Sequence, residues 1–112
     1  MKVTHEGIGY LSVTFINRNC AVGQLCTLNQ MSQGVVAEDG EAFLGVVESV
    51  EGKRMAVQIA GFVTLKYSGT APEVGYTKLS SNGNGGVRVN SAGREYFVVA
   101  CDSDAGTITM KL

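Results

Sequence analysis

Short runs of alternating apolar and polar residues follow one another along the chain, each bounded by glycine or by a charged turn. The clearest example is the stretch 42–67, in which residues 43–47 and 55–59 are mostly apolar and residues 62–67 alternate. Runs of this length that are rich in β-branched and aromatic side chains are typical of antiparallel strands. The stretch lacks the i, i+3, i+4 spacing of an amphipathic helix. The pattern therefore predicts strands.

Similar runs recur at regular spacing from residue 8 to the end of the chain. Roughly nine or ten short strands separated by turn residues predict an all-β fold, a small barrel-like or sandwich domain of antiparallel strands. The predicted strands are residues 8–16, 24–28, 35–37, 43–47, 55–59, 62–67, 76–79, 87–89, 96–101 and 107–112.

The second half of the chain repeats the plan of the first, which predicts two similar β halves rather than a longer repeat array. The spacing is about 52 positions, and glycine-valine segments mark it. The matching segments are 22–23 with 74–75, 34–37 with 86–89, and 40–47 with 93–100.

These matches give an expected domain plan. We expect one β domain, 8–112, with pseudo-repeats at about 22–67 and 74–112 and the loop 68–73 between them. The strand 8–16 is expected to pack across both halves. Residues 1–7 lack a core-forming pattern and are expected to be a flexible N-terminal arm.

The composition narrows the range of functions. The 112 residues are 45% apolar and 17% charged, which is enough for a packed core and unlike a disordered chain. The net charge of −1 gives no electrostatic basis for binding nucleic acid or an anionic membrane, so neither partner is expected. Fifteen glycines indicate many turns and bulges.

No signal for export or membrane insertion is recognised. Residues 1–7 lack the apolar segment of a leader, and no apolar run approaches the length of a transmembrane helix. The three cysteines are an odd number at irregular spacing, which does not suggest a disulfide framework. We expect synthesis in a reducing cytoplasm.

The residues with chemical potential do not form a recognisable active site. His5 is the single histidine and lies in the expected arm. Cys20, Cys26 and Cys101 do not have the paired spacing of a zinc site, and free cysteines in strands behave as small apolar residues. Residues 102–106 begin like a calcium loop but lack its later acidic ligands.

Two further loops invite a functional interpretation that their surroundings do not support. The acidic turn with Glu38, Asp39 and Glu41 has no burial to perturb its carboxylates. The glycine-rich loop 80–86 has no following Lys-Ser/Thr and no helix to hold a phosphate. Lys111 is similar to the modified lysine of biotinyl and lipoyl carriers, but it lies in a terminal strand and not at a hairpin tip. We expect no catalytic, cofactor-binding or metal-binding residue.

The stretch 62–67 predicts a contact surface instead. Phe62, Thr64 and Lys66 share one face of this strand, and Tyr67 lies on the other with two aliphatic residues. Because only one face can pack inward, either Phe62 or Tyr67 is expected to face outward, where it suits self-association. The expected interface residues are Phe62, Thr64, Lys66, Tyr67 and, in the arm, His5.

The order of these segments resembles that of small tailed-phage capsid decoration, or cement, proteins and of related head-fibre base domains. The resemblance covers about residues 8–112 and implies an all-β structural protein without catalytic residues, on the outside of a phage head, that assembles as trimers or similar oligomers. It rests on short Gly-Val-rich motifs at 21–23, 34–37, 43–47, 56–63, 74–75 and 107–112.

We therefore expect a phage or prophage virion structural protein that binds the major capsid protein and itself, most simply as a homotrimer, and that is made in the bacterial cytoplasm. The alternative is a non-enzymatic β-barrel interaction module of a bacterial or prophage complex. A small enzyme or carrier domain is the third hypothesis.

Overall fold

The computed structural model describes residues 10–112, and these form ten β-strands without a helix. The all-β prediction is confirmed. The strands are β1 (Leu11–Asn17), β2 (Leu25–Leu28), β3 (Gln33–Val36), β4 (Gly45–Glu51), β5 (Arg54–Ala60), β6 (Phe62–Ser68), β7 (Gly75–Ser81), β8 (Val87–Val89), β9 (Arg94–Asp102) and β10 (Thr107–Lys111).

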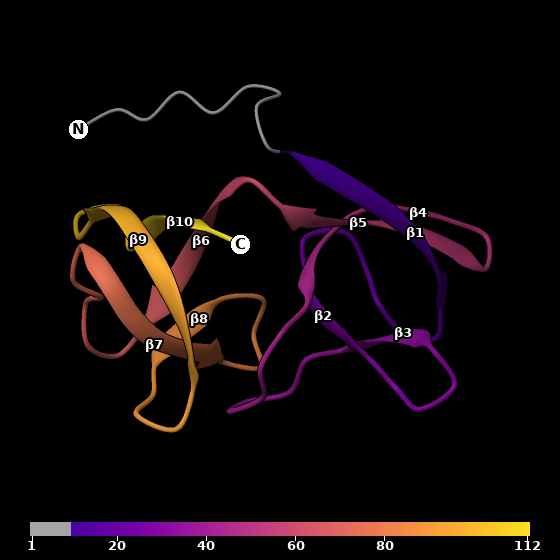
Figure 1. The fold of residues 1–112 in the computed structure, drawn as a ribbon, viewed down its shortest axis with the longest axis horizontal. Coiled ribbons are helices and arrows are strands. Elements are labelled where there is room, and N and C mark those ends of the chain that lie inside the picture. Colours follow the sequence, from indigo (N-terminus) through magenta and orange to yellow (C-terminus); the bar gives the residue numbers. More distant parts are fainter. Residues whose placement is uncertain (1–9) are drawn as a thin grey trace.

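The strands form two five-stranded closed barrels that lie side by side (Figure 1). The first barrel has the strand order β1-β3-β2-β4-β5 and the second has the order β10-β6-β8-β7-β9. In each barrel the first and third strands in the chain pair parallel, and every other pair is antiparallel. The connectivity is therefore identical in the two halves, as the repeat predicted.

The repeat is also visible in the hydrogen bonds of one loop. Asn29 Oδ1 accepts from the backbone N–H groups of Met31 and Gln33, and Asn82 Oδ1 accepts from those of Asn84 and Gly86. The two loops lie 53 positions apart, at 29 and 82, and an asparagine that bonds its own following backbone closes each one.

The expected boundaries of the repeats are wrong. The division falls at Gly61, between β5 and β6, and not in the loop 68–73. Consequently β1 belongs to the first barrel, where it pairs with β5 and β3, and does not cross both halves. The expected arm, 1–7, lies outside the described residues.

The β3–β4 loop, residues 37–44, carries side chains of the first half into the core of the second barrel. The core of the second barrel includes Leu25, Ala37 and Phe43 from the first half. The Phe43 ring stacks on that of Tyr96 at 4.9 Å between centroids, and Tyr96 Oη donates to the Phe43 carbonyl oxygen. The first barrel keeps a smaller core of its own, made of Cys20, Cys26, Val47, Met55 and Val57.

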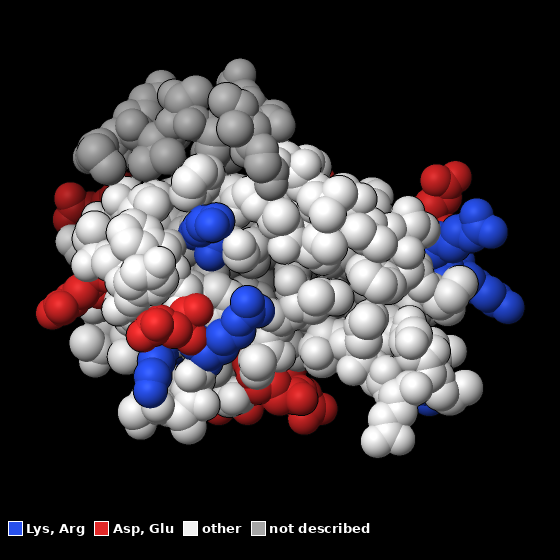
Figure 2. Space-filling model, in the orientation of Figure 1, with Lys and Arg blue, Asp and Glu red and all other residues white. Residues whose placement is uncertain are grey.

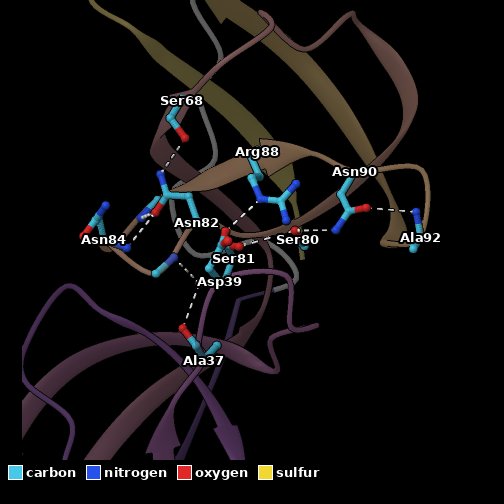
Figure 3. Close-up of polar contacts among 12 residues, drawn as sticks. Ala37, Asp39, Ser68, Ser80, Ser81, Asn82, Asn84, Arg88, Asn90 and Ala92 are labelled. Atoms are coloured by element: carbon cyan, nitrogen blue, oxygen red, sulfur yellow. Dashed lines mark hydrogen bonds and ion pairs between the residues drawn. The ribbon is translucent and has the colours of Figure 1, made fainter.

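Polar contacts also join the two barrels at this junction (Figure 3). Ser81 Oγ donates to the Ala37 carbonyl oxygen at 2.8 Å, and Arg88 Nε lies 2.8 Å from Asp39 Oδ1. At the link between the barrels, the buried Gln58 amide donates to the carbonyl oxygens of Ala60 and Phe62. The junction combines apolar packing with paired polar groups, so the barrels form one packed unit.

Candidate interaction surface

The strand predicted as a contact is β6, and its alternation is as expected. Val63 and Leu65 are buried in the core of the second barrel. Phe62 is half-buried on the opposite face, with Thr64 and Lys66 exposed beside it. Of the two aromatic residues in this strand, Phe62 is therefore the one on the outer face.

Tyr67 and His5 complete the predicted set. The half-buried Tyr67 packs against the core of the second barrel, and its backbone N–H donates to the Gly106 carbonyl oxygen. This residue closes the end of the barrel. His5 lies outside the described residues.

Strand pairing extends the outer face of β6 across three further strands of the second barrel. Phe62 lies opposite Lys111 on β10, Lys111 lies opposite Phe97 on β9, and Phe97 lies opposite Tyr76 on β7. Side chains of directly opposed residues project to the same face of a sheet. These four residues, here called the aromatic row, run around the outer wall of the second barrel.

The exposed end of the aromatic row is its most apolar part. The Tyr76 and Phe97 rings meet edge to face at 5.0 Å between centroids, with 73% of Tyr76 and 38% of Phe97 exposed. Val74, 63% exposed, precedes β7. Single exposed apolar residues are ordinary, whereas a pre-paired aromatic cluster is the type of group that anchors protein interfaces.

Charged residues border the aromatic row without forming a field of one sign. Lys78 on β7 lies opposite Glu95 on β9, and both are exposed on the same face as Tyr76 and Phe97. Acidic and basic side chains are interspersed over the visible face of the molecule (Figure 2). An apolar centre with a mixed polar rim is the usual anatomy of a protein contact.

The acidic side chains of the two candidate turns bond to neighbouring groups of the fold. Asp102 Oδ1 accepts from the backbone N–H groups of Asp104 and Ala105, which explains this acidic segment as a turn. Asp39 pairs with Arg88, and a Glu41 carboxylate oxygen accepts from the Glu38 N–H. Within residues 10–112, no three His, Cys, Asp or Glu side chains gather as a metal site would require.

The cysteines lie in or beside the cores. Cys20 and Cys26 are buried in the first barrel and Cys101 is half-buried in β9, all as free thiols. Burial raises the pKa of the Cys26 thiol to about 12, and the neighbouring Cys20 adds to that shift. Because the thiolate is the reactive form, the Cys26 environment suits packing rather than chemistry.

A shallow, open depression of about 240 Å³ lies on the outside of the first barrel. Its lining includes one acidic side chain, Glu51, and one basic side chain, Arg54, but no nucleophile that is hydrogen-bonded to a general base. The lining residues are Thr14, Ser49, Glu51, Arg54, Met55 and Ala56. No helix in the described part of the chain is long and apolar enough to cross a membrane.

Sequence reasoning missed the two most exposed rings of the aromatic row. Residues 96–101 were predicted as a strand; in β9, Tyr96 and Val98 are buried and Phe97 between them points outward. The run 96–101 is apolar throughout, so its sequence does not show which side chains face outward. Tyr76 could be assigned to the same surface only from the pairing of β7 with β9.

The fold and this surface define an all-β double barrel with an exposed aromatic row. No family model matches the chain, and no curated protein or solved structure shows significant similarity to it.

Proposed function

We propose that this chain is a non-enzymatic structural protein of a phage or prophage particle, which decorates the capsid by binding the major capsid protein from outside. The observation that supports the proposal best is the aromatic row on a packed double barrel. A decoration protein needs a stiff body with exposed anchors, and the rings of Tyr76 and Phe97 are already packed together before any partner arrives.

In this proposal the aromatic row makes the contact between copies, and the oligomer is a trimer that matches a threefold lattice point. Phe62, Thr64 and Lys66 lie at one end of that surface and Tyr76 at the other. Aromatic side chains are enriched at the centres of such contacts, since they bury a large area at a small entropic cost.

The first barrel supplies the shell-facing side. β1 pairs with β5 along its length but with β3 only at Ile16 and Asn17, so within residues 10–112 its other edge is unpaired at Ser12 and Thr14. Both residues are exposed, and the whole strand carries no charge. An open, uncharged strand edge supports docking of an extended partner segment. Residues 1–7, which precede this strand, are proposed to reach for the shell.

Cosedimentation with expanded heads of the cognate phage that lack this protein tests the proposal. We expect the wild-type protein to pellet with the heads and the double variant Tyr76→Ala, Phe97→Ala to bind at least about tenfold more weakly, because a variant that no longer forms the trimer loses the avidity of linked contacts with the head. Met31→Ala is the matched control, since Met31 is 75% exposed in the β2–β3 loop and belongs neither to the aromatic row nor to the unpaired edge of β1. Failure of the wild-type protein to bind heads would contradict the capsid role.

Light scattering over a dilution series tests self-association separately. We expect a trimer that the double variant dissociates and that Met31→Ala leaves intact. A wild-type protein that stays monomeric at high concentration would contradict the oligomer. Deleting residues 1–7 is expected to weaken head binding without changing the oligomer, and unchanged binding would argue against the arm.

A further inference from the structure

Two Asn-Gly dipeptides follow each other in the loop between β7 and β8. They are Asn82-Gly83 and Asn84-Gly85. In such a pair, the backbone nitrogen of the glycine can attack the side-chain amide carbon of the asparagine, since glycine has no Cβ to hinder the approach. The attack needs an asparagine amide that is free to rotate and a glycine N–H that is free of an acceptor.

The first dipeptide meets neither requirement (Figure 3). Asn82 Nδ2 donates to Ser68 Oγ at 3.1 Å, and Asn82 Oδ1 accepts from the N–H groups of Asn84 and Gly86 at 2.8 and 3.1 Å. The Gly83 N–H donates to Ser81 Oγ at 3.1 Å. The attacking nitrogen and the amide under attack are therefore both held by hydrogen bonds.

The second dipeptide meets both. Asn84 is exposed, and its side-chain amide points away from the loop in Figure 3. Within the described part of the chain, neither this amide nor the Gly85 N–H has a hydrogen-bond partner. Gly85 has a positive φ of 83°, and the space beside it is open, so the backbone around the attacking nitrogen is unobstructed.

We propose that Asn84-Gly85 is a site of spontaneous deamidation and isomerisation, and that the fold protects Asn82-Gly83 two residues earlier. The Gly85 nitrogen loses its proton to solvent base and bonds to Asn84 Cγ. The side-chain nitrogen leaves as ammonia, which closes a five-membered imide. Water then opens one of the two imide C–N bonds. One opening gives aspartate and the other gives isoaspartate, with no oxidant or cofactor consumed.

The two products have different consequences for the loop. Aspartate keeps the backbone length, so the bond from the Asn82 N–H to the Gly86 carbonyl oxygen is retained. Isoaspartate inserts a methylene into the main chain inside the ring that this bond closes. Gly83 in the same loop packs against the Asp39 backbone, and the Gly40 N–H donates to the Ser81 carbonyl oxygen. Isomerisation at 84 therefore loosens a loop that touches the junction between the barrels.

The test is incubation of the folded full-length chain in mildly alkaline buffer, with digestion and tandem mass spectrometry of the peptide 79–88, which contains both sites. We expect Asn84 to convert about tenfold faster than Asn82, since a hydrogen bond must open before Asn82 reacts. In concentrated urea, both sites are expected to react at similar rates. Equal rates in the folded chain, or the same ratio in both states, would overturn the proposal.

Two variants sharpen the comparison. Asn84→Gln is expected to slow the reaction at position 84 below detection, because the longer side chain must close a larger ring and does so more slowly. The rate of conversion at Asn82 is expected to stay unchanged. Ser81→Ala removes the acceptor for the Gly83 N–H and is expected to accelerate conversion of Asn82. If Ser81→Ala folds, as shown by an unchanged circular dichroism spectrum, and Asn82 stays as slow as before, the protective role of that bond is wrong.

Discussion

Phe43 is the residue through which the first half of the chain completes the core of the second. It is 2% exposed and stacks on Tyr96, with the ring planes 5° from parallel. Its position in a loop between strands gives no local sign of this role. The ring is part of a core whose other members come mainly from β6, β7, β9 and β10. Phe43 lies in a loop but is therefore packed as a core residue.

We predict that Phe43→Ala lowers the free energy of unfolding by about 3–5 kcal/mol, because it removes a buried ring and leaves a cavity beside Tyr96. Urea denaturation measures this change. Met31→Ala, at an exposed loop position, is the control and is expected to change stability by less than about 0.5 kcal/mol. A loss below about 1 kcal/mol for Phe43→Ala would show that the ring is not needed at the junction.

The buried ionisable groups predict a loss of stability in base. Burial raises the pKa of the Cys26 thiol from 9.0 to about 12, and it also raises the pKa of Cys20 and of Tyr96. A group whose pKa is higher in the folded state contributes stability that is fully present below its unfolded pKa. This contribution is then lost as pH rises through the folded pKa. For Cys26, the loss of stability therefore begins near pH 9.

We expect the free energy of unfolding to be flat up to about pH 9 and to fall above it, by at most ~1.4 kcal/mol per pH unit for each such group. Urea denaturation at a series of pH values measures the slope. Cys26→Ala lowers stability at every pH but is expected to show a shallower loss in base. An identical slope in the variant and the wild type would mean that Cys26 does not titrate in this window.

At the scale of elements, most strands follow from the sequence because one face of each is buried. The interval 87–89 matches β8, and 62–67 matches β6 to within one residue. β4 is the main discrepancy, because the predicted strand 43–47 is found at Gly45–Glu51 and continues through the mostly polar residues 48–51. Its outer half is an exposed hairpin arm paired with β5. Local polarity does not distinguish such an arm from a loop.

The repeat boundary was misplaced because β1 and β6 share alternation but few residue types. In the first half, the segments used to align the two units lie before β2, in β3 and at the start of β4, so no matched segment marked the strand that opens each unit. The face of β9 that turns outward was equally hidden. Whether Phe97 or its neighbours enter the core depends on pairing with β7 and β10, which is a long-range property.

Gly45 at the start of β4 gives a test of close backbone packing. A Cβ built there would clash with the Gln58 carbonyl oxygen and touch a Val57 methyl on β5. We predict that Gly45→Ala destabilises the protein by at least about 2 kcal/mol, since a strand backbone must shift. Gly52→Ala is the control: its φ is 59° but the space around it is open, so a cost of only about 1 kcal/mol is expected. Equal losses in thermal or urea unfolding would show that β5 yields easily.

At the scale of the whole molecule, the two halves share a topology but not a role. The β3–β4 loop of the first half, 37–44, enters the core of the second, whereas the corresponding β8–β9 loop spans only 90–93. The first barrel has a separate core, and the second is completed by its neighbour. The two barrels are thus alike in topology but unequal in packing, and the aromatic row lies on the outer wall of the second barrel.

This asymmetry predicts how the chain behaves when it is divided at Gly61. A fragment of residues 62–112 lacks Leu25, Ala37 and Phe43, so its core is open on one side and the fragment is expected to be unfolded alone. A fragment of residues 1–60 retains the smaller core and is expected to keep partial β structure. When mixed, the fragments are expected to recover the spectrum of the intact chain, because Phe43 can again stack on Tyr96.

Circular dichroism of each fragment and of their mixture measures this recovery, and Phe43→Ala in the first fragment is the control that is expected to prevent it. The intact chain is expected to unfold in a single transition, with fluorescence and circular dichroism coincident, since the core of the second barrel includes side chains of the first half. A fragment 62–112 that unfolds cooperatively alone, with the stability of the full chain, would show that the loop 37–44 covers the second barrel without holding it together.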